Sequence, residues 1–121
     1  MAARRPKIDR EERRENALRP SRYIGYNRDD LGLYFTARGA MDLAEAQFRR
    51  AIWLNPFEAE FKVHLAECLY RCKRYEEAGK WVDEALSQKP DNQNAQNLKR
   101  WIVERAAIEA RSADGRSSAA K

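Results

Sequence analysis

Four residues whose side chains can bind a metal recur at every fourth position in the middle of the chain: Glu60, His64, Cys68 and Cys72. On a helix this spacing places them along one strip of the surface, and imidazole, thiolate and carboxylate groups are zinc ligands. One helix cannot surround a tetrahedral ion, so a second helix would have to contribute. We therefore expect no metal site, and we expect the two cysteines to pack as small apolar residues.

The rest of the sequence offers no arrangement typical of catalysis. It contains one histidine, no glycine-rich phosphate loop and no Ser/His/Asp set. An active site needs polar groups that converge in a pocket, whereas the acidic residues here fall at positions expected on the surface of helices. We expect that the protein is not an enzyme and that it needs no cofactor.

The elements that carry these residues are predicted to be helices. Of the 121 residues, 36% are charged, well above the typical share of about 25%, and this favours an extended helical surface. Glycine and proline are few, and alternating, strand-like runs are absent. After residue 24, start and stop signals predict five helices over 27–38, 42–55, 58–72, 75–89 and 91–111. We expect Asn27, Asp42 and Asp91 to cap three of them, and Gly39 to stop the first.

The helical region repeats itself after 34 residues. Small residues recur where two helices must approach closely, large apolar residues recur at helical spacing between them, and a proline ends each copy. The pairs are Leu31 and Leu65, Gly32 and Ala66, Phe35 and Leu69, Ala44 and Ala78, Phe48 and Val82, Ala51 and Ala85, Ile52 and Leu86, and Pro56 and Pro90. We expect this repeated set to form the core.

This pattern resembles the tetratricopeptide repeat (TPR) family, whose 34-residue helix–turn–helix unit reads W-x2-L-G-x2-Y, then A-x3-F, then P. The first copy has "RDDLGLYF", "AEAQF" and Pro56, and the second has "KVHLAECL", "AGKWV" and Pro90. Arg28 and Lys62 stand where the family has tryptophan. The resemblance implies an all-α fold in which two repeats stack as a short right-handed solenoid.

A third copy is absent, but a mostly apolar stripe typical of a terminal capping helix follows at Ala95, Leu98, Ile102, Ala106 and Glu109. We therefore expect a basic arm, partly disordered or docked (1–24), two repeats (25–58 and 59–90), a capping helix (91–111) and a disordered tail (112–121). Such repeats usually need about three copies to be stable. We expect further burial from the arm, from a homodimer or from a partner.

In TPR proteins the first helix of each pair lines a concave groove that holds a peptide or helix of a partner protein. The resemblance assigns to this groove Tyr26, Asp29, Leu33, Thr36, Glu60, Val63, Glu67, Tyr70, Arg71, Asn97 and Trp101. The Lys/Asn clamp with which chaperone-binding members hold a terminal carboxylate is missing, because Asp29 and Leu33 stand there. The charged residues of the groove are mostly acidic, so we expect an adaptor, assembly factor or small chaperone that binds a basic or amphipathic segment. A solvated helix face without a ligand is the alternative.

A second candidate surface contains the tryptophans in the second helix of each pair. Trp53 and Trp81 fall outside the repeated core set, and Arg49 or Arg50 could stack on the ring of Trp53. Because aromatic and arginine side chains are typical interface anchors, this side and the arm could build the protein into a larger complex or a homo-oligomer. Alternatively, Trp53 is covered within the chain by the arm residues Tyr23, Ile24 and Tyr26.

Positive charge lies at the ends of the chain. Residues 1–24 carry eight Lys/Arg against four Asp/Glu, whereas residues 25–90 are nearly neutral. A basic arm can attract nucleic acid or an acidic partner, or it can be a solvated tail; nucleic acid is not expected, because no aromatic residue precedes Tyr23 among the arginines. No apolar run reaches the ~18 residues of a membrane span, and the N-terminus lacks the apolar part of a secretory signal. We expect a cytoplasmic protein without a membrane span.

Overall fold

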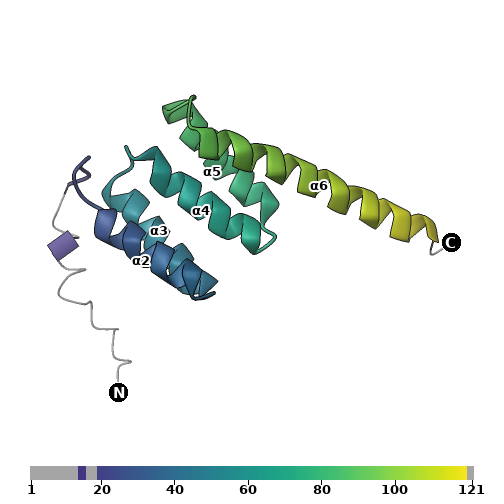
Figure 1. Cartoon of the computed structure of the whole chain (residues 1–121), viewed down its shortest axis with the longest axis horizontal. Coiled ribbons are helices and arrows are strands. Elements are labelled where there is room, and N and C mark those ends of the chain that lie inside the picture. Colours follow the sequence, from purple (N-terminus) through teal and green to yellow (C-terminus); the bar gives the residue numbers. More distant parts are fainter. Residues whose placement is uncertain (1–13, 16–18, 120–121) are drawn as a thin grey trace, which may run out of the picture.

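The computed structural model describes residues 14–15 and 19–119, with side chains as far as residue 113. From residue 19 onward it contains α2 (Tyr26–Ala37), α3 (Met41–Leu54), α4 (Ala59–Arg71), α5 (Tyr75–Gln88) and α6 (Gln93–Ala119). α2 pairs with α3 and α4 pairs with α5, and α6 lies against the second pair (Figure 1). The described part of the chain is thus an all-α helical-repeat solenoid, as expected.

The small residues of the repeated set lie where the helices of a pair approach most closely. The alanines of the set are fully buried: Ala44, Ala51, Ala66, Ala78 and Ala85. Gly32 of α2 lies so close to Phe48 of α3 that a Cβ atom at Gly32 would be 2.4 Å from Phe48 Cε1. In the second repeat Ala66 stands at the position of Gly32, and the smaller Val82 stands at the position of Phe48. This burial confirms the predicted role of the small residues.

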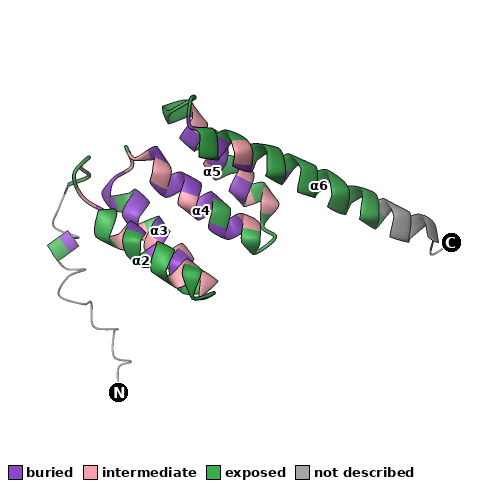
Figure 2. Cartoon of the chain, in the orientation of Figure 1, coloured by how far each residue is buried: buried purple, intermediate pink, exposed green. Residues whose placement is uncertain are grey.

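Equivalent large residues differ in burial, contrary to the prediction of one repeated core. Leu65 of α4 is 0% exposed, whereas Leu31 of α2 is 40% exposed. Likewise, Phe35 is only partly buried where Leu69 is fully buried. α4 packs between α2 and α6, but among the described residues no earlier repeat packs on the other side of α2. Figure 2 shows the result, with buried residues prevailing along α4 and more exposed residues along α2.

The start of α2 differs from the prediction that Asn27 caps it. The helix begins after Gly25, whose φ of 94° lies in the left-handed region. A Cβ atom at Gly25 would also lie 3.0 Å from the carbonyl oxygen of Ala51. Both the backbone conformation and the close approach to α3 therefore require glycine at this position.

Two further predicted caps are wrong. α6 is capped by Asn92 instead of Asp91, since Asn92 Oδ1 accepts a hydrogen bond from the backbone N–H of Ala95 at 3.1 Å. α3 begins after Ala40 and not after Asp42, and no side chain caps it. Asn92 Nδ2 also donates a hydrogen bond to Glu60 Oε1 of α4, so this cap ties α6 to the second repeat.

The turn inside each repeat needs a left-handed residue at the same place. Gly39 has a φ of 78°, and Lys73, its counterpart in the second repeat, has a φ of 63°. Nothing lies within 4 Å of a Cβ atom built at Gly39, so the backbone conformation alone favours glycine there. Gly39 ends α2 as predicted, whereas Lys73 makes the same turn without the freedom of glycine.

α6 covers the end of the second repeat, and it is longer than predicted. Three of the expected stripe residues are buried against the second repeat: Ala95, Leu98 and Ile102. Ala106 and Glu109 are exposed, and the helix continues past the predicted end at Arg111 to Ala119. Residues 112–119 are therefore helical and not a disordered tail, whereas residues 120–121 lie outside the described residues. Alanine, glutamate and arginine, frequent after residue 103, favour this continuation, and Figure 1 shows α6 projecting beyond the repeats.

Candidate interaction groove

α2, α4 and α6 lie side by side on one face of the molecule, with α4 in the middle (Figure 1). All of the residues predicted to line the groove belong to these three helices. We use "groove" for the surface formed by Tyr26, Asp29, Leu33 and Thr36 of α2, Glu60, Val63, Glu67, Tyr70 and Arg71 of α4, and Asn97 and Trp101 of α6.

Four of the groove residues meet in a pocket between α4 and α6: Val63, Glu67, Asn97 and Trp101. The rest of its lining, which the resemblance did not indicate, is His64, Asn94 and Leu98. The pocket has a volume of about 250 Å³, and we call it the α4–α6 pocket. Val63 and Leu98 are buried, whereas Trp101 is 51% exposed and presents its ring to solvent.

The α4–α6 pocket combines a carboxylate, an indole ring and amide groups. Glu67 is exposed and takes part in none of the ion pairs found in the part of the chain that the structure describes. A cation placed here would attract the Glu67 carboxylate and the face of the Trp101 ring together, and the amide oxygen of Asn94 can accept a further hydrogen bond. The chemistry of the pocket therefore suits a basic side chain.

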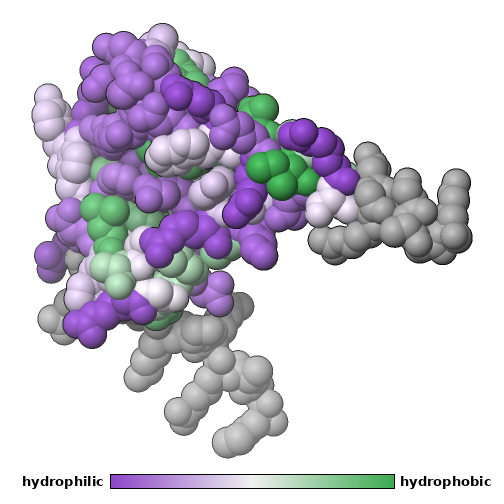
Figure 3. Space-filling view, turned by 45° about the vertical axis from the view of Figure 1, so that its right-hand side comes forward, coloured by the Kyte–Doolittle hydropathy of each residue, from purple (hydrophilic) through white to green (hydrophobic). Residues whose placement is uncertain are grey.

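Beside this pocket the groove continues along α6 into an area where aromatic and aliphatic side chains lie next to charged ones. Tyr70, Trp101, Glu104, Arg105 and Ile108 line a second, smaller hollow of about 130 Å³. Ile108 is half-exposed, and Figure 3 shows an apolar area on α6 close to its C-terminal end. Ile108 was not predicted from the sequence, although it follows Trp101 by two helical turns, which places both on one side of the helix.

A partly buried ion pair joins the two repeats in the groove. His64 Nδ1 of α4 donates to Asp29 Oδ1 of α2 at 2.7 Å, and Asp29 is buried. Burial opposes the charged imidazolium, but the hydrogen bond that His64 donates to Asp29 and the charges of Asp29, Glu60 and Glu67 outweigh it, so the pKa of His64 lies above its ordinary value. The Asp29 carboxylate is thus engaged within the chain. Sequence reasoning considers His64 only as a metal ligand and does not reveal this pair.

Other groove residues have polar groups that bind within the chain: Tyr26, Thr36 and Glu60. The Tyr26 hydroxyl donates to Glu58 Oε2 at 3.0 Å, and the Thr36 hydroxyl donates to a backbone carbonyl of α2 at 2.8 Å. Glu60 Oε1 accepts from Asn92 Nδ2 at 2.5 Å. The two remaining groove residues are exposed: Leu33 and Arg71. The surface best suited to a ligand therefore lies at the α6 side of the groove.

A sequence profile of the tetratricopeptide repeat matches residues 35–102, more than half of the chain. This region runs from the end of α2 into α6. The chain belongs to the tetratricopeptide repeat family. TPR repeats generally mediate protein–protein interactions, and TPR domains are typically non-catalytic. No curated protein matches the chain. Among the helices of the described region, none has the length and apolar character needed to cross a membrane.

On the side of the TPR stack formed by α3 and α5, an arginine lies over each tryptophan. Arg50 Cζ is 4.4 Å from the ring centroid of Trp53, and Arg49 Cζ is 5.9 Å from that of Trp81. Trp81 packs against the core, whereas Trp53 remains 52% exposed. Tyr23 is itself 88% exposed. The described part of the arm therefore does not bury Trp53, contrary to one of the two alternatives.

The arm contacts the first TPR repeat through Glu15. The Glu15 carboxylate accepts hydrogen bonds from Arg28 Nη2 at 2.8 Å, from Arg28 Nε at 2.9 Å and from Arg50 Nε at 3.2 Å. The hydrogen bond from Arg28 outweighs burial and holds the pKa of Glu15 below its usual value. Arg28 stands at the tryptophan position of the TPR motif, so an ion pair replaces an aromatic contact here. Sequence reasoning missed Glu15, because nothing distinguishes it from the other acidic residues of the arm.

The two cysteines of α4 have different environments. Cys68 is buried in the core, as predicted, and burial raises the pKa of its thiol to about 11. Cys72 is exposed, contrary to the prediction, because α4 ends at Arg71 and the chain turns away there. No three His, Cys, Asp or Glu side chains in the described part of the chain are grouped so that they could hold a metal ion.

Proposed function

We propose that this TPR protein is a non-catalytic binding module that holds a basic or amphipathic segment of a partner protein in the groove. It would act as an adaptor, an assembly factor or a small chaperone. The observation that carries the proposal is the α4–α6 pocket, where the exposed Glu67 and the half-exposed Trp101 lie beside buried apolar side chains. We place this activity in the cytoplasm, where free thiols such as those of Cys68 and Cys72 persist.

A lysine or arginine side chain matches the α4–α6 pocket in charge and in shape. Its cationic group would meet the Glu67 carboxylate and the Trp101 ring, while its aliphatic part would contact Val63. His64 does not oppose this ligand, because Asp29 balances its charge at 2.7 Å. An acidic side chain would instead meet Glu67 with like charge, which supports the choice of a basic ligand.

The apolar area around Trp101 and Ile108 would bind an apolar side chain of the partner segment, next to its basic side chain. On a helix, residues three or four positions apart lie on the same face. A helical partner segment with a basic and an apolar residue at this spacing could occupy the α4–α6 pocket and the apolar area together. An amphipathic helix therefore uses more of the exposed surface of the groove than an extended basic peptide does.

A selection from a random peptide library on the immobilised full-length chain tests this function without a known partner. We expect enriched peptides to combine lysine or arginine with aliphatic or aromatic residues. Their dissociation constants should rise at least tenfold with Glu67→Lys and with Trp101→Ala. Glu109→Lys makes the same charge change at an exposed site of α6 outside the groove, and it should leave binding unchanged.

Two outcomes would count against the groove as the binding site. Enrichment of acidic peptides would contradict the proposed ligand class. Peptides whose affinity is equal for the wild type, Glu67→Lys and Trp101→Ala would show that binding occurs on another surface. Melting curves of each variant distinguish a lost contact from a lost fold.

A second candidate function is that of a structural subunit, and the exposure of Trp53 beneath Arg50 favours it. The face around Trp53, Arg50, Arg49 and Trp81 would then join a second copy or a larger complex. Sedimentation velocity over a hundredfold range of concentration tests self-association. If this face forms a homodimer, Trp53→Ala should shift the protein to monomer; a wild-type monomer at all concentrations would exclude the homodimer.

A further inference from the structure

Equivalent positions in the two TPR repeats carry different charges. In the second repeat Lys62 of α4 pairs with Glu84 of α5, Nζ to Oε2, at 3.7 Å. Thirty-four residues earlier, the same positions hold Arg28 and Arg50. The first repeat thus places two cations where the second places a cation and an anion. Because like charges repel more strongly where water is partly excluded, an anion placed between the two guanidinium groups stabilises this arrangement.

Glu15 supplies that anion and lies between the two arginines. One carboxylate receives two hydrogen bonds from Arg28 and one from Arg50, at 2.8–3.2 Å, and the Glu15 side chain is only 8% exposed. Gln47 Oε1 accepts from Arg28 Nη1 at 3.1 Å and fixes the guanidinium from the other side. The body of the protein therefore builds a site of two oriented guanidinium groups, the geometry that suits a carboxylate best.

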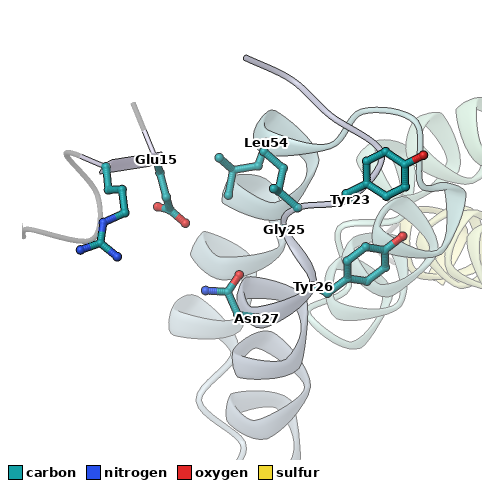
Figure 4. A pocket seen from close by; sticks show the side chains of 8 residues that line it. Glu15, Tyr23, Gly25, Tyr26, Asn27 and Leu54 are labelled. Carbon is teal, nitrogen blue, oxygen red and sulfur yellow. The ribbon is translucent and has the colours of Figure 1, made fainter. Parts of the chain in front are cut away.

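The surface next to this site is hollow. A cavity of about 300 Å³ lies between the arm and the body. Arg14, Glu15 and Tyr23 line it from the arm, and Gly25, Tyr26 and Leu54 line it from the body. Figure 4 shows Glu15 on the arm facing this space, with Leu54, Gly25 and Tyr26 across from it. The arm therefore satisfies the charge of the arginine pair and leaves room for a further side chain beside the carboxylate.

We propose that Arg28 and Arg50 form a second binding site, separate from the groove, for a carboxylate side chain of an acidic peptide segment. Glu15 occupies this site within the chain, and a partner segment displaces the arm when it binds. The cavity beside the site would then receive an apolar residue next to the partner's carboxylate. The proposal does not depend on the function of the groove, which has the opposite charge preference.

The arm itself provides a probe of known sequence. A fluorescein-labelled peptide of residues 8–20 is titrated with the full-length wild type and with full-length Glu15→Gln, and binding is followed by fluorescence anisotropy. In the wild type the tethered arm competes at a high effective concentration. We therefore expect the peptide to bind Glu15→Gln at least tenfold more tightly than the wild type. Adding Arg50→Gln to this variant should remove binding.

A matched peptide with glutamine in place of Glu15 keeps the other charges of the arm, and on the Glu15→Gln chain it should bind at least tenfold more weakly. A peptide with leucine next to the glutamate should bind more tightly than the unmodified one. Comparing peptides on one chain separates recognition from any change in stability. Equal affinity for the glutamate and glutamine peptides, or no binding of the glutamate peptide at millimolar concentration, would overturn the proposal.

Discussion

Adding one methyl group at Gly32 should destabilise the protein, although alanine is the better helix former. A Cβ atom there would lie 2.4, 2.6 and 2.8 Å from three ring atoms of Phe48, whereas carbon atoms in contact are about 3.5–4.0 Å apart. Phe48 is buried in the core, so its ring cannot shift without disturbing the side chains packed around it. Overpacking of this kind typically costs about 1–3 kcal/mol, and the gain in helix propensity offsets about 1 kcal/mol of it.

Because the contact at 2.4 Å is severe, we expect a cost in the upper part of that range, about 2–3 kcal/mol. The net expectation for Gly32→Ala is then a loss of about 1–2 kcal/mol, or roughly 5–10 °C in Tm for a domain of this size. Gly79→Ala is the matched control. Gly79 lies within α5, and a Cβ atom there would only touch Cγ2 of Ile102 in α6, at 4.0 Å. This substitution should stabilise the chain by about 0.5–1 kcal/mol. Both variants are compared with the wild type by thermal and urea unfolding followed by circular dichroism.

The second repeat suggests a sharper form of the same experiment. There alanine (Ala66) and valine (Val82) occupy the positions of Gly32 and Phe48, and both are buried, so Phe48→Val should make room for alanine at position 32. In a double-mutant cycle, Gly32→Ala should cost less in the Phe48→Val background than in the wild type, with a coupling of about 1–2 kcal/mol. Gly32→Ala as stable as the wild type, or a coupling near zero, would refute the claim that this contact requires glycine.

Three further predictions concern the turn, the partly buried ion pair and the arm. Lys73→Gly should raise the free energy of unfolding by about 0.5–1 kcal/mol in urea, because glycine adopts the left-handed backbone conformation without the steric strain of a lysine there. Gly39→Ala should lower the free energy of unfolding for the same reason. The raised pKa of His64 means that its pairing with Asp29 stabilises the fold fully below the unfolded pKa and is lost as the pH rises through the folded pKa; Tm should fall from pH 6 to pH 8.5 in the wild type and much less in His64→Gln. The pKa of Glu15 is lowered, so its pairing stabilises the fold above the ordinary value of 4.5 and is lost as the pH falls through the lower pKa of the folded state. The Tm advantage of the wild type over Glu15→Gln should therefore be present at pH 7 and shrink progressively as the pH falls below 4.5.

The repeated features of the fold were predictable from the sequence, and the ends of the stack were not. The small residues of the repeat and the stop at Gly39 follow from rules that act within one repeat. Burial of Leu31 depends on what precedes the repeat, so a pattern shared with Leu65 gives the wrong answer. Likewise, Asp91 and Asn92 both suit a cap, and only the packing of α6 decides between them.

The residues of the candidate sites also divide into those that the sequence indicated and those that it did not. Family resemblance indicated the helices of the groove and four residues of the α4–α6 pocket, because the groove is a property of the TPR fold. The pair of His64 with Asp29 and the contact of Glu15 with Arg28 join residues from different elements, and neither spacing nor composition reveals them. Of these four residues only Arg28 stood out in the sequence, because a cation at a tryptophan position of the motif needs a partner that the motif does not contain.

The indole N–H signals of the three tryptophans test the central claim most directly, because Trp101 lies in the groove whereas Trp53 and Trp81 lie on the face formed by α3 and α5. In a ¹H–¹⁵N correlation spectrum of the full-length chain, assigned with Trp→Phe variants, a basic amphipathic peptide from the library selection is added stepwise. Binding in the groove predicts a large, saturable shift of the Trp101 indole signal, with the Trp53 signal unmoved. A shift of Trp53 without a shift of Trp101 would contradict the groove and place the partner on the face formed by α3 and α5.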